Sequence, residues 1–393
     1  MLFASTDAQI RLLKSPAYSR PHISSLTTFR FIAALAIFIL HARDHNLISD
    51  GILSGFDLSQ AVTFFFVLSG FIISYSYSGR SIKFITFYRA RLARVWPAFL
   101  LSIVFVLLLL PRSLYLPAVN NLWHTLMAFF VTALGLQAWV PIPSIFFGFN
   151  AVTWSISVEF FFYFCFPFIQ HIRTIGIFFI LGITIFYSIL VAHVVSANNI
   201  PSFSTALVNE VVSEGLIYIN PLLRLPEFLS GVIAYRLFAS NFFKSINGCL
   251  YRFVSSDFAK VSGVLFVLSG GCFAYLAFRT LEFGMDLPLT LISNRFLASI
   301  NFSFLIVALS VCQDSIGRFF SWPPFVFLGE ISFGVYLYHQ PLMILAVQGE
   351  GLKFAGIQIL PLNLIAILGA TILLASSSYL FFERPLNGAL RPK

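Results

Sequence analysis

Long apolar runs of roughly 20 residues recur along the chain, separated by short polar stretches. About 20 mostly apolar residues are needed for a helix to cross the ~30 Å hydrocarbon core of a bilayer. Eleven runs of this kind begin near Phe29, Leu58, Val95, Val119, Trp154, Thr174, Val211, Val261, Asn294, Pro323 and Leu362. The pattern predicts an all-α fold, a polytopic transmembrane helical bundle with no sizeable soluble domain.

The composition supports a membrane protein. Of the 393 residues, 59% are hydrophobic and 10% are charged, whereas soluble domains average about 45–50% apolar and about 25% charged residues. A water-soluble fold of this length could not bury so much apolar surface. The same apolar and charged fractions exclude a disordered chain, a fibrous repeat protein and a nucleic-acid-binding domain. We therefore expect membrane lipids, and no nucleic acid, among the partners.

The net charge of +9 is mainly a topology signal, because Lys and Arg are retained on the cytoplasmic side of a membrane. Basic residues precede the first run, follow the second over residues 80–94, and recur at the end of the chain; residues 46–57 contain acids but no Lys or Arg. Both termini are then cytoplasmic, which requires an even number of crossings. We expect about ten spanning helices, with the polar run over residues 119–139 re-entrant or interfacial.

This pattern divides the chain into a cytoplasmic tail over residues 1–28, a transmembrane domain over 29–382 and a short cytoplasmic tail over 383–393. The sequence contains no P-loop, GxSxG, HExxH or EF-hand pattern. It also contains no zinc-type cysteine spacing. We therefore expect no metal and no permanently bound cofactor.

Ionisable residues inside membrane segments are costly, so each one suggests a function. Arg30 and His41 are eleven residues apart, which places them on one face of a helix and about 16 Å apart along its axis. Arginine suits a phosphate or carboxylate, and histidine suits proton transfer near neutral pH. The alternative is that Arg30 reaches the lipid headgroups while His41 makes a structural hydrogen bond.

Two further patterns follow along the chain. Arg91 and Arg94 are three residues apart, so they can grip one phosphate; the alternative is a topology signal or a lipid-headgroup contact. Ser155, Glu159 and Tyr163 form one polar stripe on an aromatic helix that begins at Trp154. Glu159 needs a partner on another helix or must hold a proton, unless it makes only an interhelical hydrogen bond.

For the last two patterns, a structural role is favoured over a catalytic one. Arg224 and Glu227, three residues apart beside a proline, predict an intramembrane ion pair. Ser332, Tyr336 and His339 fall on one helical face. His339 has the chemistry of a catalytic residue, although a structural or acceptor-binding role is favoured.

With these patterns the chain resembles the acyltransferase 3 family, membrane-bound acyltransferases that modify bacterial surface polysaccharides and similar acceptors. The matching motifs run in order along the sequence: Arg30-x10-His41, then residues 64–71, 87–97, 154–163, 224–231, 331–339 and 383–385. One departure is Gln60 to Thr63, where the family often has Gly-Val-Asp. We also expect no appended periplasmic hydrolase-like domain, so that transfer finishes in the membrane module or with another protein.

The resemblance implies ten transmembrane helices, a cytoplasmic acyl-CoA donor and an acceptor hydroxyl on the far side. It places Arg30 and His41 in the transfer site and makes Arg91 and Arg94 donor-side arginines. We expect O-acyl transfer, with acetyl-CoA as the favoured donor, to a glycan or lipid-linked sugar of the cell envelope. The enzyme is expected in the bacterial inner membrane.

His41 is the expected general base, and Glu159 would orient it or hold the acceptor. Arg30, Arg91 and Arg94 would bind the donor. The remaining candidates have acceptor-binding or structural roles: Trp154, Ser155, Tyr163, Arg224, Glu227, Tyr336 and His339. The alternative is a transporter or flippase that uses intramembrane Arg, Glu and His, but the matched halves that it predicts are not evident.

Overall fold

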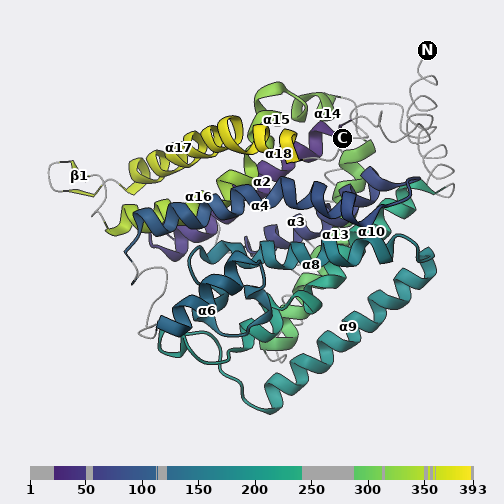
Figure 1. The fold of residues 1–393 in the computed structure, drawn as a ribbon, viewed down its shortest axis with the longest axis horizontal. Coiled ribbons are helices and arrows are strands. Elements are labelled where there is room, and N and C mark those ends of the chain that lie inside the picture. Colours follow the sequence, from purple (N-terminus) through teal and green to yellow (C-terminus); the bar gives the residue numbers. More distant parts are fainter. Residues whose placement is uncertain are drawn as a thin grey trace.

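The computed structural model describes residues 22–49, 56–111, 113, 122–240, 287–311, 315–348, 353–354, 357–358 and 360–390. Within these ranges the chain is a bundle of helices (Figure 1). The strands found there are β1 (Lys353–Phe354) and β2 (Ile357–Gln358), which form a small antiparallel pair at one edge of the bundle. The structure confirms an all-α polytopic fold.

The α-helices are α2 (Ser24–Asp44), α3 (Gln60–Tyr77), α4 (Phe84–Leu109), α6 (Leu122–Ala133), α7 (Pro143–Phe146), α8 (Trp154–Ile169), α9 (Thr174–Ala197), α10 (Pro221–Ala239), α13 (Leu287–Val311), α14 (Ser315–Phe320), α15 (Pro323–Glu330), α16 (Ser332–Gln348), α17 (Leu360–Ser378) and α18 (Arg384–Leu390). Short 3-10 turns occur at η2 (Gln137–Trp139), η3 (Ala151–Thr153) and η4 (Thr205–Leu207), and π turns at η5 (Gly215–Ile219) and η6 (Tyr379–Glu383).

In the described part of the chain, eight helical stretches are long and apolar enough to cross a membrane. The run expected near Val261 lies outside the described residues. The run expected to be re-entrant contains α6, whose 12 residues extend about 18 Å and cannot span ~30 Å of hydrocarbon. This agrees with the prediction that this segment does not cross.

Some boundaries differ from the expected ones. The helix expected to begin near Val95 begins at Phe84, so the basic run is helical and part of α4. The run expected from Pro323 is divided at Ile331 into α15 and α16. There the hydroxyl of Ser332 donates to the carbonyl of Gly329 at 2.7 Å, an interaction that competes with helical backbone bonding.

Helices α3 and α10 cross at the centre of the bundle through two glycines. A Cβ at Gly70 would lie 2.1 Å from the carbonyl oxygen of Phe228, and a Cβ at Gly231 would lie 1.9 Å from that of Val67. Glycine is therefore required at both positions for the backbones to approach so closely. This contact fixes α3, which forms one wall of the candidate site.

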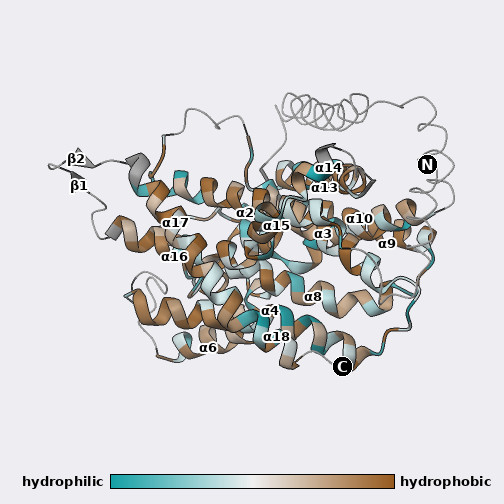
Figure 2. Ribbon diagram, turned by 90° about the horizontal axis from the view of Figure 1, so that it is seen from above, coloured by the Kyte–Doolittle hydropathy of each residue, from teal (hydrophilic) through white to brown (hydrophobic). Residues whose placement is uncertain are grey.

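The outside of the bundle is apolar. Figure 1 shows α9 and α17 on opposite sides of the molecule, and both carry exposed large side chains, such as Phe179 on α9 and Ile365 on α17. Figure 2 shows apolar residues along most of α16 and α17, whereas Arg384 and Asn387 of α18 line a cavity. The apolar exterior suits contact with lipid, whereas α18 faces a polar site.

Candidate functional site

A polar cavity of about 680 Å³ lies among α2, α3, α4, α8 and the segment from α15 to α18. Its volume falls within the range of about 300–1,000 Å³ that is usual for small-molecule sites. His22 lines the cavity just before α2 begins, and Arg384 and Asn387 of α18 line it as well. The first and last described helices therefore meet at the same end of the bundle.

The described lining of this cavity carries more positive than negative charge. It contains five arginines and three glutamates: Arg30, Arg80, Arg91, Arg94 and Arg384, with Glu159, Glu330 and Glu383. Burial lowers the pKa of His22 below its usual value, which favours the neutral form of this histidine. An excess of positive charge in an enclosed site attracts anions.

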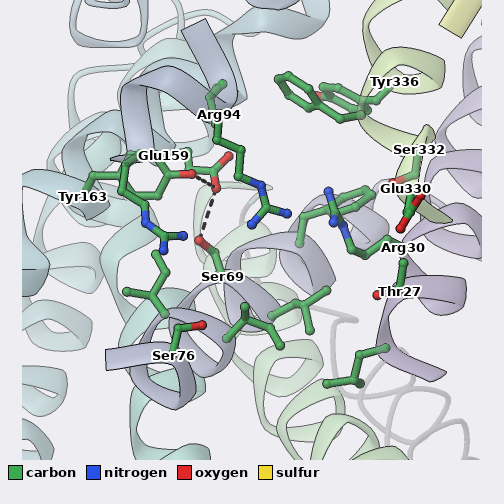
Figure 3. A pocket seen from close by; sticks show the side chains of 18 of the residues that line it. Thr27, Arg30, Ser69, Ser76, Arg94, Glu159, Tyr163, Glu330, Ser332 and Tyr336 are labelled. Atoms are coloured by element: carbon green, nitrogen blue, oxygen red, sulfur yellow. Dashed lines mark hydrogen bonds between the residues drawn. The ribbon is translucent and has the colours of Figure 1, made fainter. Parts of the chain in front are cut away.

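The three predicted donor-binding arginines, Arg30, Arg91 and Arg94, all line this cavity. Figure 3 shows the side chains of Arg30 and Arg94 reaching into the same space from different helices. Arg91 is buried, with its guanidinium carbon 5.1 Å from the ring centre of Tyr77. The helical spacing of α4 thus gives one arginine held against an aromatic ring and another that is exposed within the cavity.

The predicted polar stripe of α8 also faces the cavity, since Ser155, Glu159 and Tyr163 all line it. The Tyr163 hydroxyl donates to Glu159 Oε1 at 2.5 Å, and the Ser69 hydroxyl donates to the same oxygen at 3.2 Å (Figure 3). The interhelical partner of Glu159 is therefore Ser69 of α3. Neither of these hydrogen bonds involves His41. The contacts therefore do not support the expectation that Glu159 orients the histidine.

The partner of His41 is His339 of α16. His41 Nδ1 and His339 Nε2 are 2.8 Å apart, and the two ring planes are inclined by only 7°. His339 is completely buried, whereas His41 is partly exposed. Neither ring is part of the cavity lining described above. The structure thus divides the predicted site into an arginine-rich cavity and a histidine pair.

Tyr336 lies between these two parts. It lines the cavity, and its ring centre is 6.0 Å from that of His339. Its hydroxyl is 2.8 Å from the Ser155 hydroxyl and donates to the carbonyl of Val152 at 2.9 Å. Ser332 also lines the cavity, so the predicted stripe of α16 runs from the cavity to the histidine pair.

Asn150 was not identified from the sequence but supports this part of α16. Pro341 lacks an N–H, so the carbonyl four residues earlier, on Leu337, has no helical donor. The side chain of Asn150 donates to this carbonyl at 2.8 Å. The proline within α16 was the available signal, but nothing local indicates which distant donor compensates for it.

Arg224, Glu227 and Trp154 belong to a second buried cluster. Arg224 and Glu227 form an ion pair of 2.7 Å, with side chains 0% and 2% exposed, which is the predicted pairing. The Arg224 guanidinium also lies 4.1 Å from the ring centre of Tyr218 and 5.3 Å from that of Trp154. Arg295, which sequence reasoning missed, adds a second guanidinium 5.9 Å from the Tyr218 ring. None of these residues lines the cavity.

Comparison with known proteins decides the class of enzyme. The model of an acyltransferase domain, that of the acyltransferase 3 family, matches residues 23–380. The chain belongs to the acyltransferase 3 family. It is 34% identical over 153 residues to acyltransferase MdmB of Streptomyces mycarofaciens, a match that covers 37% of this chain and 38% of that protein. No solved structure matches the chain.

The chain therefore belongs to a family of acyltransferases, and its described residues include eight helical stretches that are long and apolar enough to cross a membrane. Among the described residues, no cluster of three or more His, Cys, Asp or Glu side chains could hold a metal ion. Three charged residues that were not predicted as site residues, Glu330, Glu383 and Arg384, also line the cavity, although the last two belong to the matching motif over residues 383–385. They lie at helix ends, and Glu383 and Arg384 fall in the tail expected over residues 383–393 rather than in an apolar run, where an ionisable residue suggests a function.

Proposed function

We propose that this acyltransferase transfers an acyl group, with acetyl favoured, from cytoplasmic acyl-CoA to a hydroxyl of a cell-envelope or exported polysaccharide. The enzyme would act in a bacterial inner membrane with both termini in the cytoplasm. The observation that carries the proposal is the arginine-rich cavity at the end of the bundle where the first and last described helices meet.

The donor fits this cavity by charge. Coenzyme A carries a 3′-phosphate and a pyrophosphate, and arginine binds such groups with planar, paired hydrogen bonds. Arg91 and Arg94 sit in the first half of α4, in the basic run that the topology rule assigns to the cytoplasm. These arginines would hold the phosphates, with Arg30 further along the cavity.

The thioester would then lie towards the histidine pair. Arg30 and His41 belong to one helix and are about 16 Å apart along its axis, a separation that suits the long pantetheine arm of coenzyme A. Tyr336 lies between the cavity and the histidines. The acceptor would approach from the opposite end of the bundle, so that donor and acceptor meet near His41.

His41 would act as the general base. It takes the proton from the acceptor hydroxyl while that oxygen attacks the thioester carbonyl carbon. The carbon–sulfur bond then breaks, and the proton passes to the departing coenzyme A thiolate. A positioned base of this kind contributes about 10²–10⁴ in rate. The products are the acyl ester of the sugar and free coenzyme A.

The test uses the purified full chain in lipid nanodiscs. Calorimetry with coenzyme A measures donor binding, and radiolabelled acetyl-CoA with isolated envelope glycan measures transfer. We expect His41→Ala to bind coenzyme A as wild type does but to lose about 10²-fold or more in transfer. Wild-type activity in His41→Ala would remove this histidine from the chemistry, and a wild-type chain that does not bind coenzyme A would overturn the choice of donor.

The arginines have a matched control on the same helix. Arg89 is exposed and does not line the cavity. We expect Arg91→Ala with Arg94→Ala to raise the KM for acetyl-CoA at least tenfold, because each lost charge-assisted hydrogen bond is worth about 1.5–3 kcal/mol. Arg89→Ala should leave KM unchanged. Equal KM values in both variants would return Arg91 and Arg94 to a topology role.

A further inference from the structure

The hydrogen-bond geometry of His339 determines where its proton lies. His339 Nδ1 is 3.1 Å from the carbonyl oxygen of Val335, one turn earlier in α16. A carbonyl oxygen only accepts hydrogen bonds, so in the neutral ring Nδ1 must carry the proton. His339 Nε2 is then an unprotonated acceptor.

The tautomer of His339 determines the tautomer of His41. His41 Nδ1 is 2.8 Å from the acceptor nitrogen of His339, so His41 Nδ1 must be the donor of that bond. The proton of a neutral His41 is then on Nδ1, and its Nε2 carries a lone pair. The opposite arrangement would place the lone pair of His339 Nδ1 against the lone pairs of the Val335 carbonyl, which is repulsive.

From this geometry we propose that His339 is a positioning residue that holds His41 in the tautomer whose Nε2 is free to accept a proton. The inference rests on the proposed function, in which His41 is the general base. In the part of the chain that the structure describes, His41 Nε2 has no hydrogen-bond partner. It is therefore the nitrogen available to an acceptor hydroxyl.

The surroundings of His339 suit a fixed partner. Its ring has no exposed surface, and its centre is 5.0 Å from that of His41 and 6.2 Å from that of Phe38. The bond from Asn150 to Leu337 and that from Tyr336 to Val152 hold α16 in the turn that precedes His339. Because ring, helix and backbone acceptor are held together, the tautomer is set before the substrates arrive.

Two substitutions separate the two hydrogen bonds of His339. In His339→Gln the amide oxygen can reach the position of Nε2 and accept from His41. In His339→Asn the shorter amide can bond to Val335 but cannot reach His41. We expect His339→Asn to lower kcat for acetyl transfer to envelope glycan about 10²-fold with an unchanged KM for acetyl-CoA, on the precedent that orienting partners of catalytic histidines are worth up to ~10⁴.

We expect His339→Gln to recover kcat to within about tenfold of wild type. A merely structural role would instead make the Gln and Asn variants equally defective, or would change KM and kcat together. Wild-type kcat in His339→Asn would overturn the proposal. Size-exclusion profiles of both variants in nanodiscs show whether each is folded.

A second readout needs no activity. Nitrogen-15 spectra of histidine-labelled protein in micelles distinguish protonated Nδ1 from protonated Nε2, and the His41 signals are assigned by their loss in His41→Phe. We expect Nδ1–H in the wild type and a mixture of tautomers in His339→Asn. Nε2–H in the wild type would refute the inference, whereas failure to transfer acetyl from acetyl-CoA with Nδ1–H intact would refute only the proposed function.

Discussion

The buried charges near Tyr218 predict an asymmetric response to two substitutions. Glu227 is the carboxylate partner of Arg224 at 2.7 Å, while Arg295 lies against the same tyrosine ring from α13. Replacing Glu227 with Leu leaves two buried guanidinium groups and removes the carboxylate that pairs with Arg224. Replacing Arg224 with Leu leaves Glu227 near Arg295, so opposite charges remain in the cluster. The variant Glu227→Leu should therefore be the less stable of the two.

The magnitude follows from the distances. The guanidinium carbons of Arg224 and Arg295 are 4.1 and 5.9 Å from one ring centre, so they are at most about 10 Å apart. Two unit charges at that separation repel by at least about 1.7 kcal/mol at an effective dielectric constant of ~20. Removing one partner of a buried pair costs about 3–5 kcal/mol by itself. We expect Glu227→Leu to exceed Arg224→Leu in cost by about 2 kcal/mol or more.

The assay is the apparent Tm of each purified variant in detergent, measured by the loss of the monodisperse peak after heating. At about 2 °C per kcal/mol for a large chain, Glu227→Leu should melt at least about 4 °C below Arg224→Leu. The double variant should melt above Glu227→Leu, because it retains a single buried guanidinium. Equal Tm values for the single variants, or a lower Tm for Arg224→Leu, would refute this electrostatic reasoning.

Three further predictions use other contacts. Gly231→Ala should lower the apparent Tm, since its Cβ would meet a backbone oxygen at 1.9 Å, whereas Gly182→Ala, with nothing within 4 Å, should not; equal Tm values would contradict the close crossing of α3 and α10. Asn150→Leu should cost about 1–3 kcal/mol, seen as a lower Tm, because the Leu337 carbonyl loses its donor; an unchanged Tm would argue against that role. Higher ionic strength should raise the KM for acetyl-CoA and leave kcat unchanged, because salt screens the excess charge of the cavity; a KM independent of salt would contradict electrostatic donor binding.

The sequence by itself determined the fold class and the faces of individual helices. Apolar runs of membrane length can be satisfied only by spanning helices or closed barrels, and these runs predicted the helical bundle. Helical periodicity is local, so it correctly placed Ser155, Glu159 and Tyr163 on one face of α8. It also placed Arg91 and Arg94 at neighbouring positions of α4 that line one cavity.

Helix boundaries were less predictable. Helix α4 begins at Phe84, within a basic run. The length of the apolar run does not reveal that this basic segment is helical, although arginine is a good helix former. The break at Ile331 is accompanied by a side-chain hydrogen bond from Ser332 to Gly329. Such details involve few residues and small energies, so hydrophobic patterning does not determine them.

Only the tertiary structure decided which helices share a site. His41 and His339 are 298 residues apart in the chain, and no local rule pairs them in preference to His41 and Glu159. Likewise, Arg295 joins the Arg224 pair, and Asn150 reaches Leu337, only after the helices have packed. Length and periodicity determine what one helix presents, because they act along the chain; the packing of side chains between helices determines which of those groups meet.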